Sequence, residues 1–139
     1  KNAVYHGGGS NHRLDLSSGI MIKDNHITNN IDKMVQKLKK QTRKLPIQME
    51  IDNINQISKA NTQAVDAFLL DNMQPVQIRR CIRKINQMKV KNKKIFIEVS
   101  GGITLKNILK YNIEGVNGIS IGALTHQSQS VDIGLDIES

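Results

Sequence analysis

Short apolar runs recur along the chain at regular intervals. Each has the length of a buried strand, and they occupy residues 19–23, 47–51, 66–70, 94–99 and 118–121. Near the end of the chain, apolar and polar residues alternate, which predicts an additional edge strand through Val131, Ile133, Leu135 and Ile137. The pattern therefore predicts a sheet of at least five strands.

Helices are predicted between these strands. Apolar residues at helical spacing indicate a helix from Asn30 to about Arg43, which Pro46 follows. Pro75 stands at the first position of a second predicted helix, which runs to about Met88. Shorter helices are expected after an Asn53 cap and from Thr104 onward.

The alternation of strands and helices predicts an α/β fold with a parallel sheet covered by helices. Five strands in this order suggest part of a barrel. A complete eight-stranded barrel takes about 250 residues, and this chain has 139. We therefore expect a single domain over residues 1–139 that forms part of an incomplete, TIM-like α/β barrel.

Composition narrows the choice of partner. The formal charge of +8 favours anionic ligands. Aromatic side chains make up only 3% of the residues, which argues against a platform for stacking nucleic-acid bases. No apolar run approaches the length of a membrane span. The single cysteine, Cys81, is predicted to be a buried thiol, and its lack of an internal partner suggests a reducing, cytoplasmic setting.

Polar residues recur where the predicted strands end. This edge of an α/β barrel carries the active site in enzymes. The residues, with the glycines among them, are Lys23, Asp24, Glu50, Asp71, Asn72, Ser100, Gly101, Gly102 and Gly122. Any one of them has an ordinary structural explanation, such as a solvated face for Glu50 or a helix cap for Asp71. Their common placement favours a binding site.

The glycine pairs indicate a phosphate ligand. Gly101-Gly102 follows the strand at 94–99 and Gly122-Ala123 follows the strand at 118–121. Glycines let a phosphate approach backbone amides, above all where a helix begins. Tight turns between strand and helix are the alternative explanation. His126 lies close enough in sequence to touch the same phosphate.

Cationic and acidic residues suggest two further subsites. His12, Arg13 and Lys23 would suit carboxylates, because arginine binds them through two parallel hydrogen bonds. Glu50 and Asp71 would suit Mg²⁺ shared with substrate phosphates. The Gly7-Gly8-Gly9 run lacks the spacing of a dinucleotide fingerprint.

Five segments together resemble the C-terminal half of quinolinate phosphoribosyltransferases. They occur in the family's order and are GGGSNHRLDLSSGIMIKDNHI (7–27), MEIDN (49–53), LLDN (69–72), SGGI (100–103) and GISIGALTH (118–126). The resemblance implies a type II phosphoribosyltransferase barrel whose N-terminal α+β domain and first barrel strands are absent from this chain. It also implies a homodimeric enzyme that joins quinolinate to phosphoribosyl pyrophosphate, releasing pyrophosphate and CO₂ to give nicotinate mononucleotide for NAD synthesis.

The resemblance assigns roles by position. His12, Arg13 and Lys23 would face the quinolinate carboxylates. Glu50 and Asp71 would face the ribose hydroxyls and Mg²⁺, so that Lys23, Glu50 and Asp71 form the expected catalytic set. The 5′-phosphate would be held through the backbone, with His126 nearby, by Ser100, Gly101, Gly102, Ile121, Gly122 and Ala123.

This chain departs from the family pattern in a few places. The family's upstream Thr-Arg-Lys motif would lie before Lys1, and Thr42-Arg43-Lys44 is not its equivalent. Asp15, Ser18 and Gln48 stand where many relatives have Gly, Asp and Glu. We expect the chain alone to be inactive, because the missing half supplies substrate contacts. Two alternatives remain, another sugar-phosphate-binding barrel enzyme and a non-catalytic basic module that binds nucleic acid.

Overall fold

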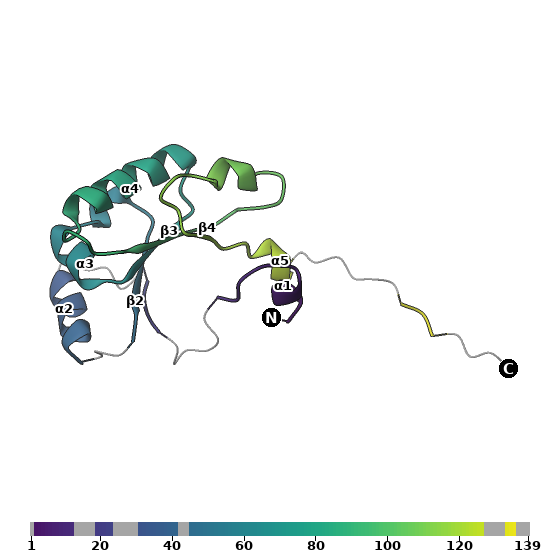
Figure 1. Cartoon of the computed structure of the whole chain (residues 1–139), viewed down its shortest axis with the longest axis horizontal. Coiled ribbons are helices and arrows are strands. Elements are labelled where there is room, and N and C mark those ends of the chain that lie inside the picture. Colours follow the sequence, from purple (N-terminus) through teal and green to yellow (C-terminus); the bar gives the residue numbers. More distant parts are fainter. Residues whose placement is uncertain (1, 13–18, 24–30, 42–44, 127–132, 136–139) are drawn as a thin grey trace.

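The computed structural model describes residues 2–12, 19–23, 31–41, 45–126 and 133–135 (Figure 1). Within α2 the side chains of residues 31, 32, 39 and 41 are outside the description. Several residues singled out in the sequence also lie outside the described ranges, namely Arg13, Asp15, Ser18, Asp24, Thr42, Arg43, Lys44, Val131 and Ile137.

The described strands form one parallel sheet in the order in which they occur in the sequence. They are β1 (Ile20–Ile22), β2 (Ile47–Ile51), β3 (Ala67–Asp71), β4 (Phe96–Ser100) and β5 (Gly118–Ile119). The predicted α/β class and the five main strands are confirmed. Each strand lies beside its successor, and right-handed crossovers then place all connecting helices on one face. This is the arrangement of an arc of a barrel.

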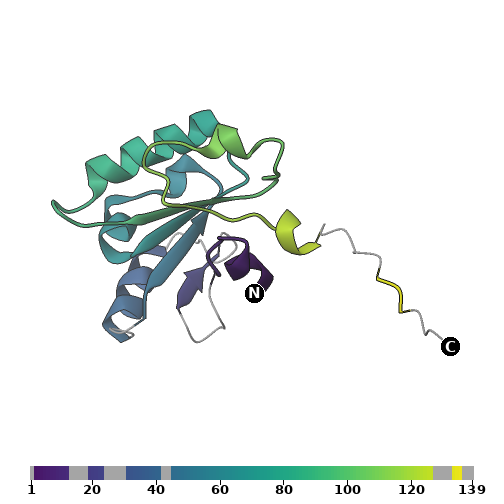
Figure 2. The same ribbon diagram turned by 45° about the vertical axis from the view of Figure 1, so that its right-hand side comes forward.

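Helices cover the outer face of the sheet (Figures 1 and 2). These are α2 (Ile31–Gln41), α3 (Lys59–Ala64) and α4 (Pro75–Met88), with the 3₁₀ turns η2 (Ile54–Gln56) and η3 (Ile108–Tyr111) in the connections. Two short helices complete the described elements, α1 (Asn2–His6) and α5 (Ala123–His126). Helix α4 has the predicted bounds and begins at its proline, which has no backbone N–H to leave unpaired.

The sheet has two different faces. In β2, Ile47, Met49 and Ile51 are buried, whereas Gln48 and Glu50 between them are only half-buried. Successive side chains of a strand point to opposite faces, so the three apolar residues pack under the helices and the two polar ones face the inside of the arc. On the helix side, α4 contributes Ile78, Cys81, Ile82 and Ile85 to the core.

Helix α3 was not predicted, because its sequence KANTQA has no apolar periodicity. It is stabilised at both ends by side chains. Ser58 Oγ accepts the Asn61 N–H, and Asn61 Oδ1 accepts the Ser58 N–H. At the other end, Lys93 Nζ donates to the carbonyls of Thr62, Gln63 and Val65 at 3.1, 2.7 and 2.7 Å.

One predicted helix is wrong, and one predicted strand is absent where its residues are described. No α-helix begins at Thr104, and the segment instead makes turns that lead to η3. Asn107 Oδ1 accepts the Thr104 N–H at 2.8 Å, and this side-chain bond competes with a regular helix. The described part of the tail, residues 133–135, is not in a strand, and Ile133 and Leu135 are 84% and 92% exposed.

The prediction of a buried thiol is confirmed. Cys81 is fully buried in α4 beside Met73 Sδ, at 3.6 Å. Burial raises the pKa of the Cys81 thiol from 9.0 to about 11, against a smaller opposing effect of the Lys84 charge. In the described ranges, the longest apolar stretches of helix are too short or too polar to cross a bilayer.

Candidate functional site

Strand register brings the polar rim residues to one face of the sheet. Asp71 of β3 pairs with Ser100 of β4. Glu50 of β2 pairs with Leu69, which lies two residues before Asp71 in β3. Lys23 directly follows β1, whose last residue pairs with Met49, so it stands level with Glu50. Because alternate residues of a strand share a face, Glu50, Asp71 and Ser100 belong to the inner face near its carboxyl edge. The predicted gathering of these positions is confirmed by the register.

Asp71 is held in place by its neighbours. Ser100 Oγ donates to Asp71 Oδ1 at 2.5 Å, and Asn72 Nδ2 donates to Asp71 Oδ2 at 2.7 Å. The Asn72 N–H also donates to the Ser100 carbonyl at 3.0 Å, which joins the ends of the two strands. Each Asp71 oxygen still has a lone pair, because a carboxylate oxygen accepts two hydrogen bonds. The carboxylate is therefore oriented and still able to bind a ligand.

Gly101 is required by the packing of this rim. Its φ is +88°, and a Cβ built on it would lie 2.1 Å from Asn72 Oδ1 and 2.6 Å from the Asn72 backbone nitrogen. Asn72 itself adopts a left-handed φ of +51°, which asparagine tolerates better than most residues. The two turns that follow β3 and β4 therefore fit against each other only with glycine at position 101.

Gly102 has an open environment. Its φ is +61°, and a Cβ there would meet no atom within 4 Å. Its carbonyl accepts the Asn107 Nδ2–H at 3.0 Å. The expected helix after Gly101-Gly102 is absent, so a phosphate here would meet the amides of a turn, without the dipole of an α-helix. Ser100 cannot use its hydroxyl proton for such a ligand while it donates to Asp71.

The second glycine loop joins β5 to α5. Ile121 and Ala123 are half-buried, and Gly122 between them is exposed. The Gly122 carbonyl accepts the N–H groups of Thr125 and His126. A Cβ on Gly122 would lie 3.9 Å from His126 Cδ2, so the imidazole lies beside this exposed glycine. That His126 and this loop bind one phosphate stays a prediction.

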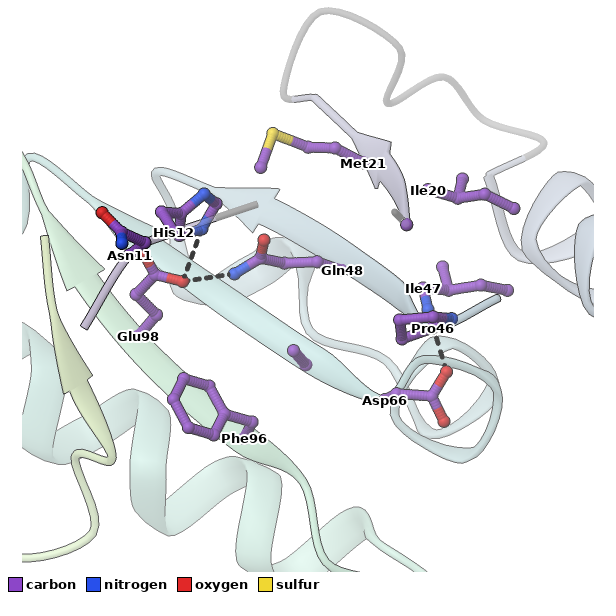
Figure 3. A pocket seen from close by; sticks show the side chains of 12 residues that line it. Asn11, His12, Ile20, Met21, Pro46, Ile47, Gln48, Asp66, Phe96 and Glu98 are labelled. Atoms are coloured by element: carbon purple, nitrogen blue, oxygen red, sulfur yellow. Dashed lines mark hydrogen bonds and ion pairs between the residues drawn. The ribbon is translucent and has the colours of Figure 1, made fainter. Parts of the chain in front are cut away.

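A cavity of about 390 Å³ opens on the inner face (Figure 3). It extends from the amino ends of the strands to Glu98, which the register places level with Glu50. Its volume is in the range of small-molecule sites. Segments before and within four strands line it, with Asn11, His12, Gln48, Asp66, Phe96 and Glu98 as its larger polar or aromatic members. Among the predicted site residues that the structure describes, only His12 lines it, whereas Lys23, Glu50 and Asp71 belong to the rim.

Glu98 occupies the centre of the cavity wall and is 5% exposed. Its Oε2 lies 3.2 Å from His12 Nε2 and accepts the Gln48 Nε2–H at 2.7 Å (Figure 3). Its Oε1 accepts the Ser120 hydroxyl. Gln48 thus supplies a neutral donor to a buried carboxylate.

Glu98 was not predicted as a site residue. A single carboxylate inside the apolar strand IFIEV was the available signal, because ionised side chains are rarely buried without partners. Its partners could not be read from the sequence, since His12 is 86 residues away.

Glu50 and Asp71 have the chemistry of a shared Mg²⁺ site. Mg²⁺ prefers one or two carboxylates together with water and substrate phosphates. Among the described residues, no three His, Cys, Asp or Glu side chains gather in a closed metal cage. Two carboxylates at an open rim are compatible with a metal that arrives with its phosphate ligand.

Comparison with known proteins gives one consistent result. A family model described as quinolinate phosphoribosyl transferase, C-terminal domain, matches residues 1–136. A probable carboxylating nicotinate-nucleotide pyrophosphorylase of Methanocaldococcus jannaschii is 41% identical over 99% of this chain and 50% of its own length. The corresponding Bacillus subtilis protein is 38% identical over 99% of this chain and 46% of its own.

Solved structures agree with the sequence comparison. The nicotinate-nucleotide pyrophosphorylase from Ehrlichia chaffeensis superimposes with a TM-score of 0.82 at 38% identity, over 99% of this chain and 49% of that one. NadC from Streptococcus pyogenes gives 0.79 at 32% identity, over 94% and 45%. The chain thus spans about half the length of the relatives it matches. With a family match along nearly its whole length, the chain belongs to the quinolinate phosphoribosyl transferase family and corresponds to its C-terminal domain.

Proposed function

We propose that this chain provides the phosphoribosyl-binding rim and part of the quinolinate pocket of a carboxylating nicotinate-nucleotide pyrophosphorylase. The observation that carries the proposal is the oriented Asp71–Ser100 pair beside the Gly101-Gly102 turn, at the carboxyl edge of a parallel sheet. This arrangement offers a fixed carboxylate for ribose hydroxyls and an open backbone turn for the 5′-phosphate. The family match supports the assignment.

In the proposed reaction the pyridine nitrogen of quinolinate attacks the anomeric carbon of phosphoribosyl pyrophosphate. A C–N bond forms as the C–O bond to pyrophosphate breaks. The carboxylate at C2 then leaves as CO₂, and that carbon takes a proton from solvent, giving nicotinate mononucleotide. No protein nucleophile is needed, so most of the acceleration comes from holding both substrates in one geometry.

The described residues divide this work between two subsites. Glu50 and Asp71 would accept hydrogen bonds from the ribose hydroxyls, and their charge would stabilise the positive charge that develops at the anomeric carbon. Lys23 and His12 would bind the carboxylates of quinolinate, together with Arg13. Backbone groups at residues 100–102 and 121–123 would hold the 5′-phosphate, with His126 beside Gly122.

Bound Mg²⁺ would neutralise charge on the leaving pyrophosphate. Glu50 and Asp71 would hold it, in line with their oxygen chemistry and open position. We further propose that the complete protein is a cytoplasmic homodimer, as the family resemblance implies. Sedimentation equilibrium of the complete protein tests the dimer, and a monomer at micromolar concentration would contradict it.

Calorimetry tests the proposed function directly. We expect the chain to bind quinolinate, and to bind phosphoribosyl pyrophosphate only with Mg²⁺ present. Arg13→Ala should remove quinolinate binding, and Asp71→Ala should remove binding of Mg²⁺-phosphoribosyl pyrophosphate. The exposed Glu114 provides the control variant Glu114→Gln. A well-folded chain that binds ribose phosphates but no pyridine dicarboxylate would instead favour another sugar-phosphate enzyme.

A further inference from the structure

The Glu98 carboxylate joins three segments that are far apart in the sequence. His12 precedes β1, Gln48 belongs to β2, and Ser120 follows β5. Among the described residues, His12 is the only group in ion-pair contact with Glu98. Gln48 and Ser120 donate hydrogen bonds to the carboxylate, and such donors stabilise a carboxylate that is buried.

This arrangement determines which imidazole nitrogen faces Glu98. The Gln48 amide and the Ser120 hydroxyl donate to the carboxylate, and Glu98 Oε2 can likewise only accept from the ring. His12 Nε2, at 3.2 Å, must then carry the proton of that hydrogen bond. The second ring nitrogen, Nδ1, points away from Glu98 (Figure 3).

The side chains of His12 and Glu98 differ in their exposure to solvent. The His12 side chain is 49% exposed, whereas that of Glu98 is 7% exposed. Both residues line the cavity, but a ligand can reach the imidazole more easily than the carboxylate.

We propose that Glu98 is a positioning residue for the pocket that binds pyridine dicarboxylates. It holds His12 with Nε2–H directed at the protein, so that Nδ1 is the nitrogen presented to the ligand. When the ring is protonated, Nδ1–H donates to a ligand carboxylate while Nε2–H stays bonded to Glu98. The inference rests on the proposed function, because it takes quinolinate as the ligand.

A purely structural role for Glu98 gives different expectations. The carboxylate also ties β5 to β4 through Ser120, and that tie alone would affect stability. Ser120→Ala removes the tie without changing the contact with His12. Both Glu98→Gln and Ser120→Ala would then lower stability, and neither would change His12 or ligand affinity.

The first measurement is side-chain nitrogen NMR of the histidines, with His12 assigned by His12→Gln. We expect His12 to show a protonated Nε2 with a slowly exchanging, downfield proton. Glu98→Gln should abolish that signal, and Ser120→Ala and Glu114→Gln should preserve it. A wild-type His12 with its proton on Nδ1, or an unprotected Nε2–H, would overturn the proposal without any variant.

The second measurement is calorimetric affinity for quinolinate. We expect Glu98→Gln to weaken binding about tenfold, the low end of what a hydrogen bond involving a charged group contributes. His12→Gln should cause a similar loss, and the double variant should lose no more than either single one. Unchanged affinity in a folded Glu98→Gln variant would overturn the proposal.

Two further results are distinguishable. Circular dichroism would reveal whether Glu98→Gln folds. If it does not, Glu98→Asp is the alternative variant, because it keeps the charge but shortens the side chain by one methylene. The His12 signal should again be lost. If the wild-type chain shows the His12 signal but binds no quinolinate, the proposed ligand is rejected, whereas the NMR result still decides whether Glu98 positions the ring.

Discussion

Replacement of Gly101 by alanine tests how the rim is built. The new Cβ would lie 2.1 Å from Asn72 Oδ1 and 2.6 Å from the Asn72 nitrogen, at a φ of +88°. The left-handed backbone alone costs a residue with a Cβ about 1–2 kcal/mol. Movement of Asn72 would also weaken its hydrogen bond to the Asp71 carboxylate, which contributes about 1.5–3 kcal/mol. We therefore expect Gly101→Ala to lower the free energy of unfolding by about 2.5–5 kcal/mol.

Gly102→Ala is the matched control. Gly102 also has a positive φ, +61°, but its Cβ would meet nothing within 4 Å. Only the backbone penalty of about 1–2 kcal/mol should apply. Urea denaturation followed by circular dichroism gives both values, and binding of Mg²⁺-phosphoribosyl pyrophosphate should fall most in Gly101→Ala. Equal destabilisation by the two substitutions would refute the argument that Gly101 is needed because of Asn72.

Other predictions concern stability, pH and turnover. Lys93→Met keeps the aliphatic stem but removes the donor that binds the carbonyls of Thr62, Gln63 and Val65 at the end of α3. It should lower the free energy of unfolding by about 1–3 kcal/mol, whereas Lys91→Met at an exposed position should not. The Cys81 thiol keeps its proton in the folded state up to a pKa of about 11, against 9.0 for the unfolded chain. The unfolded state thus binds fewer protons between these values, so stability should fall by up to about 3 kcal/mol as pH rises from 9 to 11. Urea midpoints across this pH range should show the fall, and Cys81→Val should lack that component. Finally, a spectrophotometric assay should detect no quinolinate turnover by the chain alone, and measurable nicotinate mononucleotide would contradict this.

Local patterns were sufficient for much of the fold. The alternation in IQMEI defined β2 and its two faces, and Pro75 with four apolar residues at helical spacing defined α4. The rim positions Glu50, Asp71 and Ser100 followed from the ends of strands. These features depend on residues that are close in sequence, and the spacing of apolar and polar residues reveals them directly.

Other features were decided by tertiary contacts. The sequence predicted a helix after Gly101-Gly102, but the Asn107 side chain bonds to the backbone of that loop. It gave no reason to assign Lys93 to α3, because the carbonyls it binds are 28 to 31 residues earlier.

What the sequence by itself determined is the α/β class, the order of the strands, and the family through its spaced motifs. Only the tertiary structure placed Glu98 between Gln48, Ser120 and His12, and only it showed why position 101 must be glycine. The physical reason is the same in both cases. Two residues that are distant in sequence come into contact only when strand register brings them together. The periodicity of the sequence shows which face of an element each residue occupies, but it does not show which residue lies opposite.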